Sequence, residues 1–382
     1  GFQPLTTANT RPVKVISRSD QFVGVTTWRG NGSTQTINNY NFSPDLVFIK
    51  AYAGAAEGSM FVYDTVRGPI KRLSPRNNSV ESDQTNGLTA FTDKGFSVGD
   101  NSSHNYNNDK YVAWSFKAGG SKGTFNKDGV SYATAAAAGL DGGSGTVTGA
   151  SVGTKQGFSI ISYTGNSTNP TTFSHGLLEA PTFVVIKNRD RDTNGDWIVG
   201  HADADGNGFA EGNQLVLSSI AAVDGGSSNF FSGTAPTSSV FTVKDNYQTN
   251  YAGDDYIAYL WHDVPGLQKF GKCTGSIATA QPHFVDLGFK PALVIIKRTD
   301  NTGTWTFWDS VRNEHNPATK KLFTTSPSNE SDTSNDAIDI LSDGFAIRSS
   351  NAFTFTGSQE YVFMAWAEAP SVDLYGGGAN AR

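Results

Sequence analysis

The sequence has a single cysteine, Cys273, among its 382 residues. One thiol cannot form a disulfide within the chain, so the stapling typical of small secreted domains is excluded and the fold must depend on packing. Methionine is also scarce, with 2 residues, and no apolar run approaches the roughly 18 residues that a membrane-spanning helix needs. We therefore expect no insertion into a membrane.

Charge is low as well. Charged residues make up 17% of the chain, and the formal net charge is −6. A protein that binds the phosphate backbone needs clustered Lys and Arg side chains to release counterions, so nucleic acid is not an expected partner. The signature of a zinc protease is also missing, because the His residues of the chain do not pair at metalloprotease spacing.

Glycine and aromatic residues are abundant instead. The chain has 42 Gly, 25 Phe, 13 Tyr and 7 Trp. This balance favours short strands joined by tight polar turns, with aromatic side chains filling the core. No convincing helical period longer than two turns is present. The sequence therefore predicts an all-β fold.

A repeated pattern runs through the chain. The motif P-x-x-V-x-I-K occurs at residues 44–50, 181–187 and 291–297. Proline can open a strand because the first position need not donate to the ladder. A closing strand, with a Tyr and a second aromatic residue five positions later, follows at 111–116, 256–261 and 361–366. Anchors in one order predict three copies of one structural unit.

Short alternating runs between these anchors predict about seven or eight strands per unit, which is typical of a β-sandwich. We therefore expect three tandem β-sandwich repeats of a jelly-roll or lectin-like kind. The expected divisions are an N-terminal arm at 1–19, sandwiches at 20–118, 156–264 and 265–370, a Gly/Ala/Ser-rich linker or insertion at 119–155, and a C-terminal tail at 371–382.

The three P-x-x-V-x-I-K strands should be equivalent. Residues two apart in a strand point to the same face, so the Val and Ile of each motif should be buried together. These residues are Val47 and Ile49, Val184 and Ile186, and Val294 and Ile296.

Repeats one and three share a further motif. Asp64-Thr65-Val66-Arg67 matches Asp309-Ser310-Val311-Arg312, whereas repeat two has an Asp-, Asn- and Gly-rich loop from 197 to 212. We expect the Asp and Arg to form an ion pair that holds a turn.

Two loops of repeat two are calcium candidates. Asp190, Asp192 and Asn194, and then Asp203, Asp205 and Asn207, place oxygen side chains at alternate positions before a Gly, as calcium loops do. Their twelfth positions are His201 and Gln214 instead of the bidentate Glu. Since Asp, Asn and Gly also form tight turns without metal, a calcium site and an empty turn both stay open. No other cofactor is expected.

Glycan hydrolysis would need two carboxylates, one with a raised pKa. The candidate pairs are Asp254 and Asp255, Glu81 and Asp83, and Glu330 and Asp332. All lie in predicted turns, where access of water works against such a shift. We expect no catalysis.

Several segments together resemble a known family. They are P-D-L-V-F-I-K at 44–50, D-T-V-R-G at 64–68, D-K-G-F at 93–96, Y-V-A-W with K-A-G-G at 111–120, and L-Y-G-G-G-A-N-A-R at 374–382. The chain resembles repeat-containing virion structural or tail-fibre-like proteins of marine tailed phages, including cyanophages. The resemblance implies a non-catalytic place on the virion surface, with a role in particle assembly and host attachment.

The expected partners follow from that resemblance: a homo-oligomer, such as a trimer, other virion proteins, and a host cell-surface glycan. The main interpretation holds the sandwiches rigidly in a row, with Leu374 and Tyr375 of the tail docking on a neighbour. The alternatives are a secreted carbohydrate-binding or adhesin array and a polysaccharide depolymerase, because a β-sandwich alone supports all three.

Overall fold

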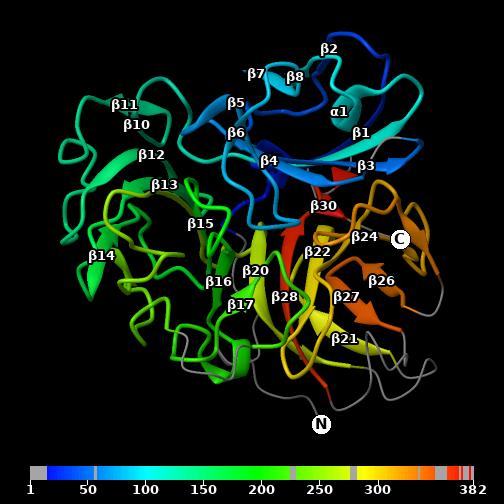
Figure 1. Ribbon diagram of the computed structural model, residues 1–382. Helices are drawn as coiled ribbons and strands as arrows, with labels where there is room; N and C mark the ends of the chain where they lie inside the picture. Colours follow the sequence, from blue (N-terminus) through cyan, green and yellow to red (C-terminus); the bar gives the residue numbers. More distant parts are fainter. Residues whose placement is uncertain are drawn as a thin grey trace.

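The computed structural model describes residues 15–369 except 56–57, 224–228, 276–281, 334–335 and 349–358, together with 371–372 and 378–379. The described chain is almost entirely β-structure (Figure 1). Its helical segments are single turns: η1 (Ser19–Gln21), α1 (Ser102–Asn105) and η2 (Ala204–Gly206). No helix in these residues is long and apolar enough to span a bilayer. The predicted all-β sandwich fold is confirmed.

Lobe 1, blue to cyan in Figure 1, contains β1 to β9. Its large sheet has the order β1-β9-β3-β4-β5-β6, and its small sheet has the order β2-β8-β7. The strands are β1 (Val23–Arg29), β2 (Gln35–Ile37), β3 (Leu46–Ala53), β4 (Met60–Asp64), β5 (Gly68–Leu73), β6 (Ser82–Asp83), β7 (Leu88–Thr92), β8 (Gly95–Val98) and β9 (Lys110–Phe116).

Lobe 2, green in Figure 1, contains β10 to β19. Its large sheet has the order β11-β10-β12-β13-β19-β15-β16-β17, and its small sheet pairs β14 with β18. The strands are β10 (Phe125–Lys127), β11 (Val130–Tyr132), β12 (Val147–Gly153), β13 (Phe158–Thr164), β14 (Thr171–Ser174), β15 (Phe183–Asn188), β16 (Trp197–His201), β17 (Leu215–Val216), β18 (Val240–Val243) and β19 (Asp255–Trp261).

Lobe 3, yellow to red, contains β20 to β28. Its large sheet has the order β20-β28-β22-β23-β24-β25, and its small sheet has the order β21-β27-β26. The strands are β20 (Gln268–Thr274), β21 (His283–Asp286), β22 (Pro291–Arg298), β23 (Thr306–Asp309), β24 (Lys320–Phe323), β25 (Ser331–Asp332), β26 (Ile338–Leu341), β27 (Gly344–Ile347) and β28 (Glu360–Ala367).

A short hairpin of β29 (Ser371–Val372) and β30 (Gly378–Ala379) follows lobe 3. Leu374 and Tyr375, the apolar residues on which the predicted docking of the tail depends, lie outside the described residues.

The P-x-x-V-x-I-K strands β3, β15 and β22 occupy equivalent positions. Each pairs antiparallel with the closing strand of its lobe, β9, β19 or β28. That strand pairs in turn with the first strand of the repeat, β1, β13 or β20. The Val and Ile side chains of the motifs are all buried, at most 2% exposed, on the face that packs against the small sheet of their own lobe. Both predictions for these strands are confirmed.

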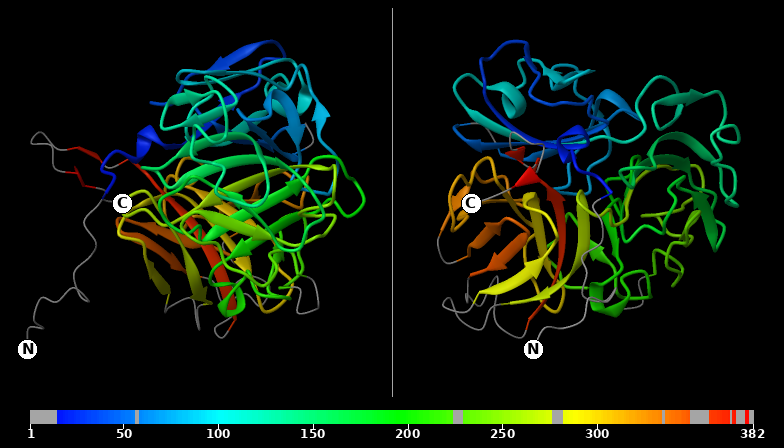
Figure 2. Two further views of the ribbon diagram at one scale, coloured as in Figure 1. Left: turned by 90° about the vertical axis from the view of Figure 1, so that its left-hand side faces the viewer. Right: turned by 180° about the vertical axis from the view of Figure 1, so that it is seen from behind.

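The three lobes surround one shared core, and Figure 2 shows this arrangement from two further sides. The second face of each large sheet contributes to a single cluster that joins all three lobes. The expectation of sandwiches in a row is therefore wrong. The lobes pack around a common core because each large sheet is apolar on both faces, and a linear array would leave one face of each sheet exposed to water.

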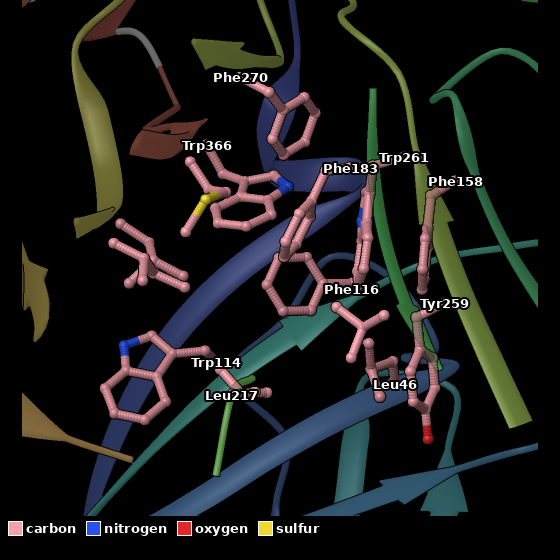
Figure 3. Close-up of a cluster of buried hydrophobic side chains, with 14 of the residues drawn as sticks. Leu46, Trp114, Phe116, Phe158, Phe183, Leu217, Tyr259, Trp261, Phe270 and Trp366 are labelled. Carbon is pink, nitrogen blue, oxygen red and sulfur yellow. The ribbon is translucent and has the colours of Figure 1, made fainter. Parts of the chain in front are cut away.

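Three aromatic residues meet at the centre of this shared core. They are the last aromatic residues of the closing strands: Phe116, Trp261 and Trp366 (Figure 3). Each contacts the other two edge to face, with ring centroids 5.1 to 6.1 Å apart. Such edge-to-face pairs add to the free energy gained by burying the rings. The spacing of the closing-strand motif thus places one ring from each lobe at a common point.

The lysine that ends each P-x-x-V-x-I-K motif connects neighbouring lobes. Each lysine is fully buried and donates to a backbone carbonyl in a loop of the next lobe. Lys50 donates to Ser326 O at 2.7 Å, Lys187 to Asn78 O at 3.3 Å and Lys297 to Ala221 O at 2.6 Å. Lobe 1 therefore contacts lobe 3, lobe 2 contacts lobe 1, and lobe 3 contacts lobe 2, in a closed ring.

A backbone hydrogen bond repeats the same ring. In each lobe the carbonyl two residues after the buried lysine accepts from the loop of a neighbour. The bonds are Glu81 N to Arg189 O (2.8 Å), Val223 N to Thr299 O (3.0 Å) and Glu330 N to Tyr52 O (2.9 Å). The lobes are thus related by a cyclic pseudosymmetry within a single chain.

The Gly- and Ala-rich segment at 119–155 is an insertion in lobe 2. Its strands β10, β11 and β12 extend the large sheet, and β12 pairs antiparallel with β13 along most of its length. The segment therefore does not act as a free linker between lobes 1 and 2.

We expect Trp366→Ala to lower the free energy of unfolding by about 3–5 kcal/mol, because it removes a buried ring shared by three lobes. Trp366→Phe should cost much less, since Phe116 already fills the equivalent place and Trp366 Nε1 has no hydrogen-bond partner in the described residues. Chemical denaturation followed by fluorescence and circular dichroism measures both. A single shared transition is expected, and separate transitions for separate lobes would contradict the shared core.

Burial, and then the positive charge of Arg298, lower the pKa of Lys297 to about 7, from an ordinary value of 10.5. The unfolded chain therefore binds more protons than the folded chain between these pH values, so Lys297 makes the free energy of unfolding rise with pH in this window. In Lys297→Met the free energy of unfolding should therefore rise less with pH. Chemical denaturation of the native protein and of the variant at pH 6 and pH 9 tests this. An equal change in the free energy of unfolding between the two pH values in both proteins would contradict it.

Candidate functional site

The Asp-Arg motif of lobe 1 lies at the contact with lobe 2. Arg67 Nε donates to Asp64 Oδ2 at 2.5 Å, and both side chains are fully buried. Tyr259 of β19, in lobe 2, donates its hydroxyl to the same carboxylate oxygen at 2.7 Å. Glu81 accepts from Arg67 Nη1 at 3.0 Å and completes the group. The predicted ion pair is confirmed, and it also binds a neighbouring lobe.

Lobe 3 repeats this arrangement toward lobe 1. Arg312 Nε donates to Asp309 Oδ2 at 2.7 Å, and Arg312 Nη1 donates to Glu330 at 2.6 Å. Trp114 of β9 donates its ring N–H to Asp309 Oδ2 at 3.2 Å. Trp114 and Tyr259 hold the same place in their closing strands, three residues after the Tyr.

Lobe 2 has a different solution at the equivalent place. His201 lies opposite Phe183, as Asp64 lies opposite Leu46. The matching closing-strand residue of lobe 3 is Met364, which carries no N–H or O–H donor. The buried His201 instead contacts the Phe363 carbonyl, with Nε2 3.3 Å from the oxygen. Repeat two therefore lacks the Asp-Arg motif at the interface where the neighbouring closing strand has Met364, which could not donate a hydrogen bond to an aspartate.

Two of the carboxylates considered for hydrolysis lie at these interfaces instead of in exposed turns. Burial alone would raise the pKa of Glu81, but hydrogen bonds and charge from Arg189 and Arg67 hold it below its usual value. Burial raises the pKa of Glu330 in spite of Arg312. Both side chains are bound by arginine, so their geometry is that of structural ion pairs.

Three of the remaining candidates for hydrolysis have side-chain partners. Asp83 pairs with Lys71 at 2.6 Å on the surface. Asp254 accepts hydrogen bonds from Arg191 and from Asn188, and Asp255 accepts from the Thr164 hydroxyl at 2.7 Å. Asp332 lies in the edge strand β25.

In the first calcium candidate loop one oxygen side chain binds the backbone of a neighbouring strand. Asp190 Oδ2 accepts from the backbone N–H of Asp255 at 2.6 Å. Asp192 is exposed, and Asn194 has a positive φ of 56°. Side-chain amides tolerate this conformation, which is typical of tight turns.

The second candidate loop is similar. Asp203 precedes η2, Asp205 has a φ of 44°, and Asn207 Oδ1 accepts from Phe209 N at 3.2 Å. Within the part of the chain that the structure describes, no group of three or more His, Cys, Asp or Glu side chains is placed to hold a metal ion. The geometry adds no support for calcium, which stays a prediction.

An exposed aromatic cluster, which the sequence did not single out, lies in the loops of lobe 2. Tyr247 and Tyr251 are 43% and 37% exposed, and their ring centroids are 4.6 Å apart. The Arg191 guanidinium lies within 4.8 Å of both rings and is held by Asp254. Partly exposed tyrosines beside an arginine are typical of contact surfaces. Tyr106, 50% exposed, is the equivalent of Tyr251 in lobe 1.

We expect Arg67→Met to destabilise the protein by about 3–5 kcal/mol, because Asp64 would stay buried without its ion-pair partner. The double variant Asp64→Asn/Arg67→Met should recover part of the loss. Arg18→Met, at the exposed Arg18–Asp20 pair, serves as the control and should have little effect. Thermal unfolding measures all three, and equal stability of Arg67→Met and the native protein would show that the interface does not depend on this pair.

Comparison with known protein families gives a match. The family model described as Domain of unknown function (DUF7483) matches residues 18–370, which span all three lobes. No curated protein matches the chain. No solved structure matches it either. Since the match covers nearly the whole chain, the protein belongs to the DUF7483 family, a domain of unknown function.

Proposed function

We propose that the chain is a non-catalytic structural and attachment component of a phage virion, in a tail fibre, an appendage or the particle surface. The observation that carries the proposal is a three-lobed body, joined by one shared core, whose exposed tyrosines, Tyr106, Tyr247 and Tyr251, lie in loops. Rigid scaffolds that present loops are typical of binding proteins. The resemblance of its repeat motifs to virion structural proteins supports the particle location.

The use of the ionisable groups supports the absence of catalysis. Glu81 and Glu330 are bound by arginines that also hold Asp64 and Asp309. Removing Glu81 or Glu330 for acid or base chemistry would take one of two carboxylate partners from a buried arginine at a lobe interface. These groups therefore stabilise the body of the protein.

The proposed partners are further copies of this chain, other virion proteins and a host cell-surface glycan. The repeated inner faces are already used within one chain, since they form the shared core. A homo-oligomer must therefore assemble through the outer surfaces of the lobes. Its symmetry then concerns whole three-lobed bodies and not single sandwiches.

We expect an antibody against the chain to label intact particles at fixed, symmetric positions in electron micrographs. The same images count the copies at each position, and a single copy would contradict the homo-oligomer. Label found only on soluble protein outside particles would favour the secreted carbohydrate-binding array. Release of reducing sugar from host polysaccharide by the purified chain, lost in Glu81→Gln or Asp254→Asn, would contradict the non-catalytic role.

A further inference from the structure

A polar groove of about 250 Å³ lies in the loops of lobe 1. It differs in kind from the small cavity of about 30 Å³ inside the shared core, which is lined by apolar and aromatic residues. Every residue that lines the groove is a glycine or carries a polar side chain. They are Gly32, Ser33, Thr34, Thr85, Asn86, Thr89, Gly99 and Asp100.

Two of the loops that line this groove, at 31–34 and 99–100, are held together by one buried side chain, Asn105. Its Nδ2 donates to Gly99 O at 3.0 Å and to Asn31 Oδ1 at 2.9 Å. Its Oδ1 accepts from Asn31 N at 3.0 Å, and its carbonyl accepts from Gly32 N at 2.8 Å. Because Asn105 is fully buried and joins these loops, the groove is formed before any ligand arrives.

The groove also has unused hydrogen-bonding capacity. Asn86 Nδ2 donates to Asp100 Oδ1 at 2.7 Å and so fixes the orientation of the carboxylate. The second oxygen, Asp100 Oδ2, makes no hydrogen bond within the described residues, nor do the side-chain hydroxyls of Ser33, Thr34 and Thr85. An oriented carboxylate beside several hydroxyls offers acceptors and donors at once.

We propose that this groove binds one end of a neutral saccharide. A carboxylate hydrogen-bonds well to sugar hydroxyls, whereas its charge disfavours acidic sugars. The volume is below the roughly 300–1,000 Å³ of pockets for larger ligands, which suits about one sugar ring. Tyr106, half exposed, directly precedes Asn107, the residue that borders Gly32, so an aromatic side chain belongs to the same loop cluster. The biological meaning of this site rests on the proposed attachment role.

Lobe 2 provides an internal comparison. Counted back from the closing-strand tyrosines, Asn250 is the equivalent of Asn105 and Asp245 of Asp100. Asn250 joins its own loop in the same way, accepting from Asn166 N at 3.0 Å. The two groove glycines are replaced, however, because Ser167 stands for Gly32 and Lys244 for Gly99.

The close approach of two loops explains why position 99 is a glycine. A Cβ there would lie 2.6 Å from the Asn86 carbonyl oxygen, so only glycine allows these two loops to approach so closely. Lys244, at the equivalent place in lobe 2, has a Cβ, so the corresponding loops of lobe 2 cannot approach each other in the same way. Asp245 can therefore serve as a control, because it is the equivalent of Asp100 but does not line the groove.

The test uses the full chain and a panel of neutral oligosaccharides built from hexoses and N-acetylhexosamines, with isothermal titration calorimetry on those that bind. Asp100→Asn should weaken binding about tenfold to a hundredfold, as expected for loss of one hydrogen bond to a charged group. Thr34→Trp, at an exposed position on the rim, should block the groove. Asp245→Asn should bind as the native chain does, and circular dichroism checks that each variant folds.

Saturable binding that persists in EDTA and is lost in both groove variants supports the proposal. No binding by any neutral saccharide, an equal loss in Asp245→Asn, or calcium binding at Asp100 without saccharide binding would overturn it. The saccharide titration uses isolated protein, whereas the antibody labelling uses virions. The proposed saccharide site and the proposed place on the virion can therefore fail independently.

Discussion

Burial of both faces of three β-sheets around one aromatic core is the constraint on which this structure depends. An antiparallel sheet commonly leaves one face in water, and its strands then alternate between apolar and polar residues. Here every residue of β22 is buried, and β28 is buried after its first residue. The lobes therefore cannot be separated without exposing a large apolar surface, and they behave as one body.

That burial also explains the polar groups between the lobes. The loops that cross from one lobe to the next bring backbone carbonyls into a region without water, and an unpaired carbonyl there is costly. Lys50, Lys187 and Lys297 supply the donors. Their own burial is tolerated because each ammonium is surrounded by carbonyl oxygens, as the contacts of Lys297 with Ala221 and Arg298 show.

Local parts of the fold could be predicted from the sequence, because they depend on neighbours in one strand. The P-x-x-V-x-I-K spacing placed Val47 and Ile49 on one buried face, and the Asp64–Arg67 spacing indicated an ion pair. The assembly of the lobes was mispredicted, since a strand pattern does not say what covers its second face. A usable signal was present in β9, where Val112, Trp114 and Phe116 are apolar on the face opposite Tyr111 and Ala113.

The candidate site was less predictable for the same reason. Alternating Asp and Asn residues at 190–194 and 203–207 suit both a calcium loop and a plain turn, and only coordinates show which backbone groups they serve. The cluster of Tyr247, Tyr251 and Arg191 joins residues distant in sequence, so no local motif announces it.

The three interfaces between the lobes differ in chemistry, so each lobe fits best beside its own neighbours in the ring. Asp64 receives a tyrosine hydroxyl, Asp309 receives an indole N–H, and His201 reaches a backbone carbonyl beside a methionine. A lobe from a second chain that entered at the wrong place would bring Met364 against a buried aspartate and leave that carboxylate without its donor. Divergence among the repeats thus discriminates against exchange of lobes between chains, a hazard for any protein built from similar units.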